Sequence, residues 1–167
     1  WVFLLKWGDF SEIIAIDAHH GEEVARAELK TWGPSVCISP DGSRLYAMTL
    51  EDGIEVLSAP ALERIGSVDP DAGFTQSPAL SPDGNILAYT FRDQSTNQEM
   101  LRLWNLDQDR SVQEFPIGAT HLHRVPFFSP DGRLLACLAP DHSGRWLIDL
   151  DHPAETGFTR LGSNSSY

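Results

Sequence analysis

The sequence predicts an all-β protein made of repeated antiparallel blades, and two recurring patterns support this prediction. The first is the tetrapeptide Ser-Pro-Asp-Gly, which begins at Ser39, Ser81 and Ser129, so that its copies are 42 and 48 residues apart. The second is an apolar strand ending in an acidic or small polar residue; its copies end at Asp17, Ser58, Asn105 and Asp149, at intervals of 41, 47 and 44 residues. Recurrence at about 20–50 residues indicates a propeller or a similar array.

Each Ser-Pro-Asp-Gly copy is predicted to be the tight corner of a β-hairpin. Proline fixes φ at the first central position, aspartate can bond its own backbone nearby, and glycine accepts the positive φ that closes the turn. Apolar residues alternate on both sides, which indicates strands with one buried face. The alternating pairs are Val36 and Ile38, Leu45 and Ala47, Ile86 and Ala88, and Leu134 and Ala136. On this pattern the first copy carries one extra residue after its glycine.

Taken in order, a full unit reads strand, corner, strand, variable loop, strand, polar turn, strand. Four antiparallel strands in about 40–50 residues form the blade of a β-propeller. The predicted blades span residues 1–31, 32–69, 70–117 and 118–162, followed by a tail at 163–167. The first lacks its innermost strand, which leaves about 3.75 blades, close to the lower limit of the four to eight in a closed ring.

This count favours an open arc, either a fragment of a larger ring or half of a two-copy assembly. An open arc would expose an apolar side of its terminal blades, and such surfaces pair with a partner or aggregate. We expect a fragment more than a two-copy ring.

The strand Leu101–Leu106 resembles the strand that gives the WD-repeat propellers their name, with Asn105 in place of the aspartate. The Gly-His dipeptide of that family is absent about ten residues before each corner, where Leu29, Asp71 and Ala119 stand instead. The resemblance therefore implies a propeller without the His-Ser-Trp hydrogen-bond relay of well-formed WD blades. The prolines within Ser77–Ser81 and Arg124–Ser129 are more similar to TolB-like propeller repeats.

Net charge, apolar runs and cysteine content bear on which partner and which compartment the chain is suited to. Twelve Lys and Arg against 24 Asp and Glu leave a formal charge of −12, which disfavours nucleic acid. The apolar run Trp1–Leu5 is too short for a membrane span. Cys37 and Cys137 fall at non-equivalent places in different repeats, so we expect two small core side chains and no disulfide. We leave the compartment open, with the cytoplasm favoured over the periplasm.

No sequence motif for a catalytic nucleophile, phosphate-binding loop or metal site is present. The repeated Asp41, Asp83 and Asp131 are explained by their role in the turns. His121 and His123 could face the same way on an extended segment, but a third ligand cannot be named, so we expect no metal. His19 and His20 are expected in a solvated turn. The chain is therefore predicted not to be an enzyme and to need no cofactor.

Residues on the rim opposite the corners are the candidates for binding a partner. Binding residues concentrate on loops held by a rigid scaffold, and aromatic and arginine side chains dominate binding hot spots. The predicted rim comprises Trp32, Arg92, His121, His123 and Arg124, with Arg92–Glu99 as the longest loop insertion. Packing of Trp32 between blades is the favoured alternative for that residue.

The function predicted from these features is a non-catalytic scaffold that binds a protein or peptide. The alternative is an accessory propeller that gates or docks onto an enzyme, as TolB-like propellers do for α/β-hydrolase peptidases, or a TolB-like periplasmic propeller. Self-association and further blades from the parent chain remain open as ways to cover the terminal blades.

Overall fold

The structure, a computed structural model, describes residues 1–6, 11–31, 35–50, 53–72, 75–118, 125–138, 144–152 and 159–162. In these ranges the chain forms β-strands and one short 3₁₀ turn, η1 (Pro70–Ala72). None of the described segments forms a helix long and apolar enough to cross a membrane. The chain divides into two compact units, Trp1–Pro78 and Ala79–Tyr167, with the boundary inside one strand.

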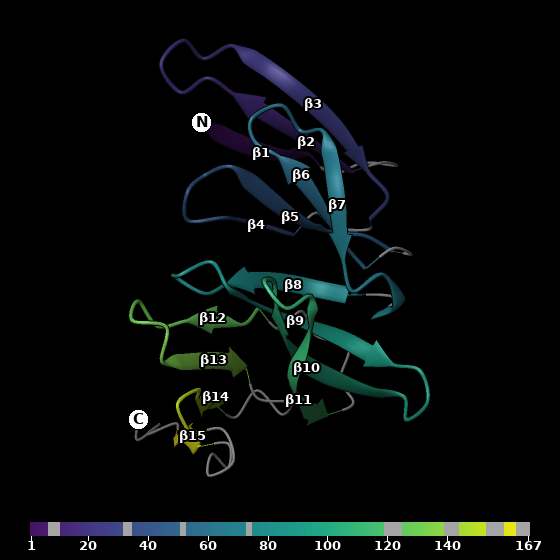
Figure 1. Cartoon of the computed structure of the whole chain (residues 1–167), viewed down its shortest axis with the longest axis vertical. Helices are drawn as coiled ribbons and strands as arrows, with labels where there is room; N and C mark the ends of the chain where they lie inside the picture. The colour runs from purple at the N-terminus through teal and green to yellow at the C-terminus, as the bar shows by residue number, and fades with distance from the viewer. Residues whose placement is uncertain are drawn as a thin grey trace, which may run out of the picture. The chain divides into compact units, whose positions relative to one another are not determined.

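The first unit contains two antiparallel sheets (Figure 1). Sheet 1 has the strand order β1-β2-β3 and sheet 2 the order β4-β5-β6-β7. Their strands are β1 (Val2–Lys6), β2 (Ser11–Ile16), β3 (Glu23–Leu29), β4 (Val36–Ile38), β5 (Arg44–Met48), β6 (Ile54–Ser58) and β7 (Arg64–Val68). Consecutive strands are neighbours throughout, which is the meander of a propeller blade.

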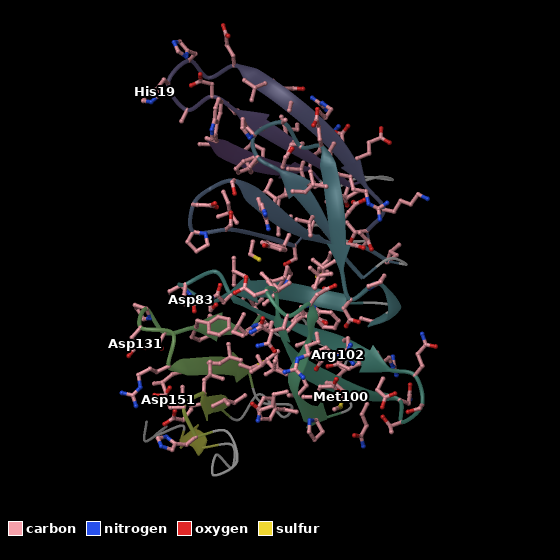
Figure 2. The ribbon with its side chains drawn as sticks, viewed as in Figure 1. His19, Asp83, Met100, Arg102, Asp131 and Asp151 are labelled. Carbon is pink, nitrogen blue, oxygen red and sulfur yellow. The ribbon has the colours of Figure 1, made fainter. Side chains whose placement is uncertain are left out.

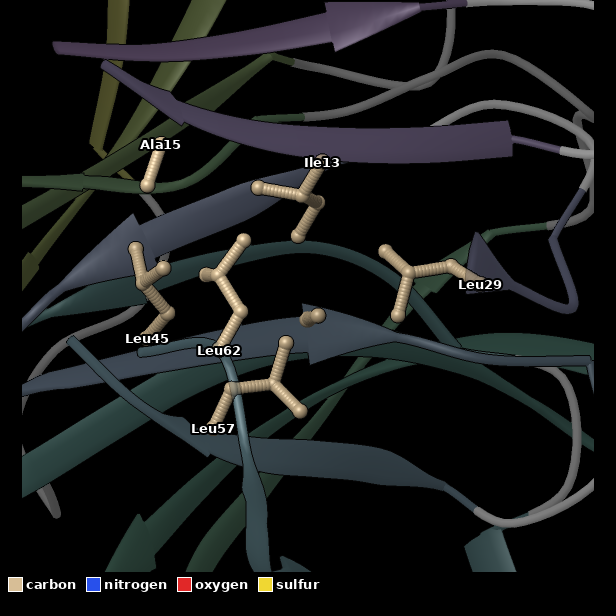
Figure 3. Packing of buried hydrophobic residues seen from close by; sticks show 7 residues of the cluster. Ile13, Ala15, Leu29, Leu45, Leu57 and Leu62 are labelled. Atoms are coloured by element: carbon tan, nitrogen blue, oxygen red, sulfur yellow. The ribbon is translucent and has the colours of Figure 1, made fainter. Parts of the chain in front are cut away.

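Sheets 1 and 2 pack on each other through one hydrophobic cluster, which we call the first cluster (Figure 3). Its buried members are Ile13, Ala15 and Leu29 from sheet 1, and Leu45, Ala47, Leu57 and Leu62 from sheet 2 and its last turn. Phe3, Leu5, Ala25 and Ala27 pack against it from sheet 1. Alternate residues of β2 supply the buried face, because successive side chains of a strand point to opposite faces.

Sheets 3 and 4 are likewise antiparallel, with the orders β8-β9-β10-β11 and β12-β13-β14-β15. Their strands are β8 (Thr75–Leu80), β9 (Ile86–Asp93), β10 (Gln98–Asn105), β11 (Arg110–Gly118), β12 (Phe127–Phe128), β13 (Leu134–Leu138), β14 (Gly144–Asp149) and β15 (Thr159–Gly162). Four small sheets of three or four strands confirm the all-β prediction and are consistent with propeller blades.

A second cluster joins sheets 3 and 4. It contains Ala88, Leu101, Leu103, Phe115 and Ile117 from sheet 3, and Leu135 and Ile148 from sheet 4. Ile86, Phe128 and Leu150 pack against it. The second cluster therefore repeats the arrangement of the first, in which two consecutive sheets of one unit bury one face each against the other.

The strand that follows each corner starts at the same distance from it, so the predicted extra residue after the first corner is wrong. The serine N–H donates to the carbonyl five residues later in every copy: Ser39 to Arg44, Ser81 to Ile86 and Ser129 to Leu134, at 2.8–2.9 Å.

The error arose because two of these strands bury both faces. Residues Leu45 to Met48 are at most 4% exposed, and Leu87 to Tyr89 are 0% exposed. An alternating pattern identifies one face only, and the pair chosen in the first copy lies on the opposite face from the pairs in the other two.

Candidate functional site

Each Ser-Pro-Asp-Gly corner is closed by its own hydrogen bonds, as predicted. In the second copy the Ser81 hydroxyl donates to Asp83 Oδ1 at 2.5 Å and accepts from the Ile86 N–H at 2.8 Å. Asp83 Oδ1 also accepts from the Asn85 N–H at 3.1 Å, and Gly84 has φ of +80°. The same three bonds recur in the corners of Asp41 and Asp131, the latter labelled with Asp83 in Figure 2.

These bonds stabilise the ionised form of each corner carboxylate. The serine hydroxyl is the largest cause, followed by the backbone N–H, and together they lower the pKa of Asp83 and Asp131 and that of Asp41 to about 2. A general acid or base needs a pKa near the working pH. The hydrogen bonds of the three carboxylates are therefore those of turn residues.

Of the five residues predicted to form the binding rim, the described part of the chain contains Arg92. Its Nε donates to Asn97 Oδ1 at 2.9 Å, so the guanidinium is held by its own hairpin. The other four residues, Trp32, His121, His123 and Arg124, lie outside the described residues.

Half of the variable loop predicted over Arg92–Glu99 is strand. β9 runs to Asp93, β10 starts at Gln98, and Arg92 pairs with Glu99 across the hairpin. The residues between the strands are fastened by Asp93, whose carboxylate accepts from the Thr96 and Ser95 hydroxyls at 2.7 Å and from the Ser95 N–H at 2.9 Å. These bonds, that of Thr96 foremost, lower the pKa of Asp93 to about 2. The hairpin thus extends sheet 3, and its turn is closed by hydrogen bonds to Asp93.

The first histidine pair lies in an exposed turn, as predicted. The Asp17 carboxylate contacts His20 Nδ1 at 2.9 Å and accepts from the His19 N–H at 2.8 Å. The His20 contact is the main reason why the pKa of Asp17 is lowered. In the described ranges no three His, Cys, Asp or Glu side chains lie close enough to hold a metal.

Both cysteines are free thiols, as the sequence led us to expect. Burial raises the pKa of Cys37 to about 12. Since the thiolate is the nucleophile and the metal ligand, Cys37 is a packing residue in this environment.

Trp104 bears on the resemblance to WD repeats. Its indole Nε1 is buried and has no hydrogen-bond partner. In a well-formed WD blade this N–H would end the His-Ser-Trp relay, so the relay is absent at Trp104, as expected.

Arg102, labelled in Figure 2, lies in the same sheet. Its guanidinium lies 3.9 Å over the Phe91 ring, and its Nε contacts Glu114 Oε1 at 2.9 Å. Both of these Arg102 contacts lie within sheet 3, which gives it a structural role.

An apolar groove of about 220 Å³ lies on sheet 4. It is lined by Phe127, Phe128, Ser129, Pro130, Leu134, Ala136 and Leu147. Phe127 lies opposite Ala136, and Ala136 opposite Leu147, so these three side chains share one face of the sheet. The neighbouring Leu135 and Ile148 point to the other face, into the second cluster. We call the groove side the forward face of sheet 4.

The forward face of sheet 4 is not sealed. The Phe127 side chain is 50% exposed, whereas Ala136 at the bottom of the groove is 7% exposed. An exposed aromatic ring beside an apolar hollow is typical of a surface that binds another macromolecule.

Sheet 1 also has an apolar face directed away from its cluster, which we call its rear face. Val2 and Leu4 are 45% and 48% exposed there and lie opposite Ile16 and Ile14. Charged side chains border this apolar area: Glu12 Oε2 lies 2.9 Å from Lys6 Nζ and 3.0 Å from Arg26 Nη1, and both contacts, Lys6 first, lower the pKa of Glu12. The rear face is a second candidate surface.

Sequence reasoning expected apolar terminal faces but did not name the groove residues. The paired phenylalanines Phe127 and Phe128 were the available signal, because adjacent strand residues face opposite ways and two large rings indicate that both faces bury apolar surface. The sequence prediction placed the binding residues on the rim loops instead.

Comparison with known proteins shows the fold. A chain described as Kuenenia stuttgartiensis hydrazine synthase has a similar structure, with a TM-score of 0.70 and 19% sequence identity. The match covers 96% of this chain and 51% of that one, so this chain spans about half the length of the solved structure. No protein-family model matches the sequence, and no curated protein matches it. At this identity the likeness supports the architecture and no particular activity.

Proposed function

We propose that this chain is a non-catalytic β-propeller segment that serves as a scaffold for binding a protein. The observation that carries the proposal is the groove on the forward face of sheet 4, where a half-exposed Phe127 borders an apolar hollow. Asp41, Asp83 and Asp93 accept hydrogen bonds within their own turns, and the groove itself is apolar, so apolar contact is the proposed basis of binding. The rim of Trp32, Arg92, His121, His123 and Arg124 stays part of the proposal as a second binding surface.

Within the propeller class, the features favour a TolB-like repeat over a well-formed WD repeat. Trp104 Nε1 has no partner for a WD relay, and β8 contains Pro78. A proline inside the first strand of a blade is the feature that resembles TolB-like repeats.

A photo-crosslinking residue in place of Phe127 tests the scaffold function in cells of the source organism. We expect it to form a defined covalent adduct with a protein. The matched control is the same residue in place of Ile65, an isoleucine on β7 that is 54% exposed and outside the groove. If position 127 captures nothing beyond what position 65 captures, the groove is not a binding surface and the proposal fails.

The second candidate function is an accessory propeller carried by an enzyme. The solved chain with a similar fold is described as a hydrazine synthase, and this chain matches about half of it. The sequence of the parent gene beyond residues 1 and 167 decides between the two functions. A neighbouring catalytic domain, such as one with a Gly-x-Ser-x-Gly nucleophile elbow, would favour the accessory function, whereas further Ser-Pro-Asp-Gly repeats alone would favour the scaffold.

A further inference from the structure

Each corner of this chain places an exposed aspartate directly before a glycine. The three pairs are Asp41-Gly42, Asp83-Gly84 and Asp131-Gly132. A glycine nitrogen can attack the carboxyl carbon Cγ of the aspartate before it, because glycine has no side chain to hinder the approach. The new C–N bond closes a five-membered succinimide, and one carboxyl oxygen leaves as water. Water then opens the ring at either carbonyl, which restores aspartate or leaves isoaspartate, whose backbone runs through the former side chain.

Hydrogen bonds to the carboxylate oppose this ring closure in two ways. The Cα–Cβ bond has to rotate to bring Cγ to the glycine nitrogen, which breaks the bonds. The leaving oxygen also has to take up protons, which a lone pair that already accepts a hydrogen bond does less readily. All three corners share two such bonds on Oδ1, from the serine hydroxyl and from the N–H two residues after the aspartate. In each corner the glycine N–H also donates to the serine carbonyl at 2.8–2.9 Å.

The corners differ at the second carboxylate oxygen, Oδ2, because a different residue follows each corner glycine. In the first corner the Ser43 hydroxyl lies 2.8 Å from Asp41 Oδ2. In the second corner Asn85 Nδ2 donates to Asp83 Oδ2 at 3.3 Å. Both oxygens of these two carboxylates are therefore held, and that of Asp41 is held at the shorter distance.

In the third corner the residue after the glycine is Arg133, and its side chain is bound elsewhere. Its Nε donates to Asp151 Oδ2 at 2.7 Å; Figure 2 labels both Asp131 and Asp151. Within the described ranges, no other residue donates a hydrogen bond to Asp131 Oδ2. This oxygen can take up protons and leave as water, and the Asp131 carboxylate has fewer hydrogen bonds to break than the other two.

We propose that Asp131-Gly132 is a site of isoaspartate formation in the folded chain, and that the side chain after each corner glycine determines how readily that corner isomerises. Ser129 and Pro130 line the groove on sheet 4, so isomerisation at Asp131 changes the border of the groove. The inference goes beyond the proposed function and does not depend on it.

The first test is to incubate the chain at neutral pH and to measure isoaspartate at each corner by peptide mapping with mass spectrometry. We expect isoaspartate to form at Asp131 roughly three to ten times faster than at Asp41, which is the effect of one hydrogen bond of ordinary strength. Asp83 is expected to lie between them. In urea, where the corners are unfolded, the three rates are expected to converge. Mapping counts the fourth Asp-Gly pair of the sequence, Asp52-Gly53, separately.

Two variants of Arg133 test the role of the residue after the glycine. Arg133→Ser and Arg133→Ala both remove the arginine and its contact with Asp151, and only the serine supplies a hydroxyl like that of Ser43. Isoaspartate at Asp131 is therefore expected to form roughly three to ten times more slowly in Arg133→Ser than in the matched control Arg133→Ala. The reverse change, Ser43→Ala, is expected to speed isomerisation at Asp41 by a similar factor.

Three results would overturn the inference. They are equal rates at Asp41 and Asp131 in the folded chain, equal rates at Asp131 in Arg133→Ser and Arg133→Ala, and a faster rate at Asp131 that persists in urea. The last would make the local sequence the cause and not the folded corner. Circular dichroism checks that each variant is folded, and Ser43→Ala, in another sheet, tests the same rule without altering the third corner.

Discussion

The two units have the same structure at their corners and different structures at the opposite end of their hairpins. At the corner end, the hydrogen bonds around Asp41 and Asp83 are the same to within 0.1 Å. At the opposite end, Gly53 before β6 lies close to the backbone of Asp69, whereas β9 and β10 are joined by a turn whose hydroxyls donate to Asp93. The corner end therefore repeats between the two units, and the opposite end of the hairpin differs between them.

One position shows the difference most clearly. Gly53 and Asn97 are the residues immediately before β6 and β10, and both have positive φ, at +71° and +57°. A Cβ on Gly53 would lie 2.2 Å from the Asp69 carbonyl oxygen. Asn97 instead uses its side chain to accept from Arg92 Nε. In the first unit the position before β6 requires glycine, because the backbone of Asp69 lies too close for a side chain. In the second unit the position before β10 is an asparagine, whose side chain makes a hydrogen bond with Arg92.

The largest effect is therefore expected for Gly53→Ala. A left-handed conformation costs a non-glycine residue roughly 1–2 kcal/mol, and here the backbone of Asp69 must also move. Gly132→Ala in the second unit, where φ is +75° and the nearest atom, Pro82 Cδ, is 3.6 Å away, should lose only the roughly 1–2 kcal/mol of conformational strain. Urea denaturation of both variants measures the free energy of unfolding.

The control is Gly66→Ala, in β7, where nothing lies within 4 Å of an added Cβ and no positive φ is required. Its free energy of unfolding should stay near that of the wild type. A loss for Gly53→Ala no larger than that for Gly132→Ala would show that the hairpin of the first unit is not held by Asp69, and the contrast between the two units would disappear.

An effect of intermediate size is expected from the corners as pH falls. The folded pKa of Asp41, at about 2, lies below the ordinary value of 3.8. A carboxylate with a lowered folded pKa stabilises the protein fully above about pH 4, and this contribution is lost as pH falls through the folded value. The melting temperature of the wild type should therefore decline from about pH 4 to about pH 2 more steeply than that of Asp41→Asn.

Asp93→Asn makes the same test in the hairpin between β9 and β10. Its melting temperature between about pH 4 and about pH 2 is compared with those of the wild type and of Asp41→Asn. Asp93 also has a pKa of about 2, so the melting temperature of Asp93→Asn should fall less steeply than that of the wild type over the same pH range. If the melting temperatures of the wild type and both variants fell equally with pH, these turn hydrogen bonds would not form in solution.

The sequence was informative where a residue type has one structural use. Ser-Pro-Asp-Gly has to form a tight turn, so the corners and the all-β class were predictable, and the same reasoning placed Cys37 and Cys137 in separate strands. It failed at β5 and β9, because alternation reports one buried face and these strands bury two. It also failed at Arg92–Glu99, where polar residues suggested a loop although cross-strand pairing extends the sheet.

The forward face of sheet 4 could not have been read from Phe127 and Ala136 separately, since both look like ordinary core residues. Whether an apolar strand residue is covered depends on what packs over it, and that is a property of three-dimensional arrangement. The alanine row that makes the groove becomes visible only when strand register places Ala136 opposite Leu147.

The smallest effect is expected for Trp104→Phe in the second unit. Leu57 occupies the equivalent place in the first unit and has no N–H to satisfy. An unpartnered buried donor carries a desolvation cost of roughly 1–3 kcal/mol, and Trp104 Nε1 is such a donor. Removing it offsets the packing lost with the smaller ring, so the free energy of unfolding should change by less than about 1 kcal/mol. Trp104→Leu, which copies the first unit without an aromatic ring, separates the packing loss from the loss of the N–H. If Trp104→Phe instead cost several kcal/mol, as removal of one partner from a buried network does, the N–H would have to be bonded in solution, and the second unit would be a WD blade in a way that the first is not.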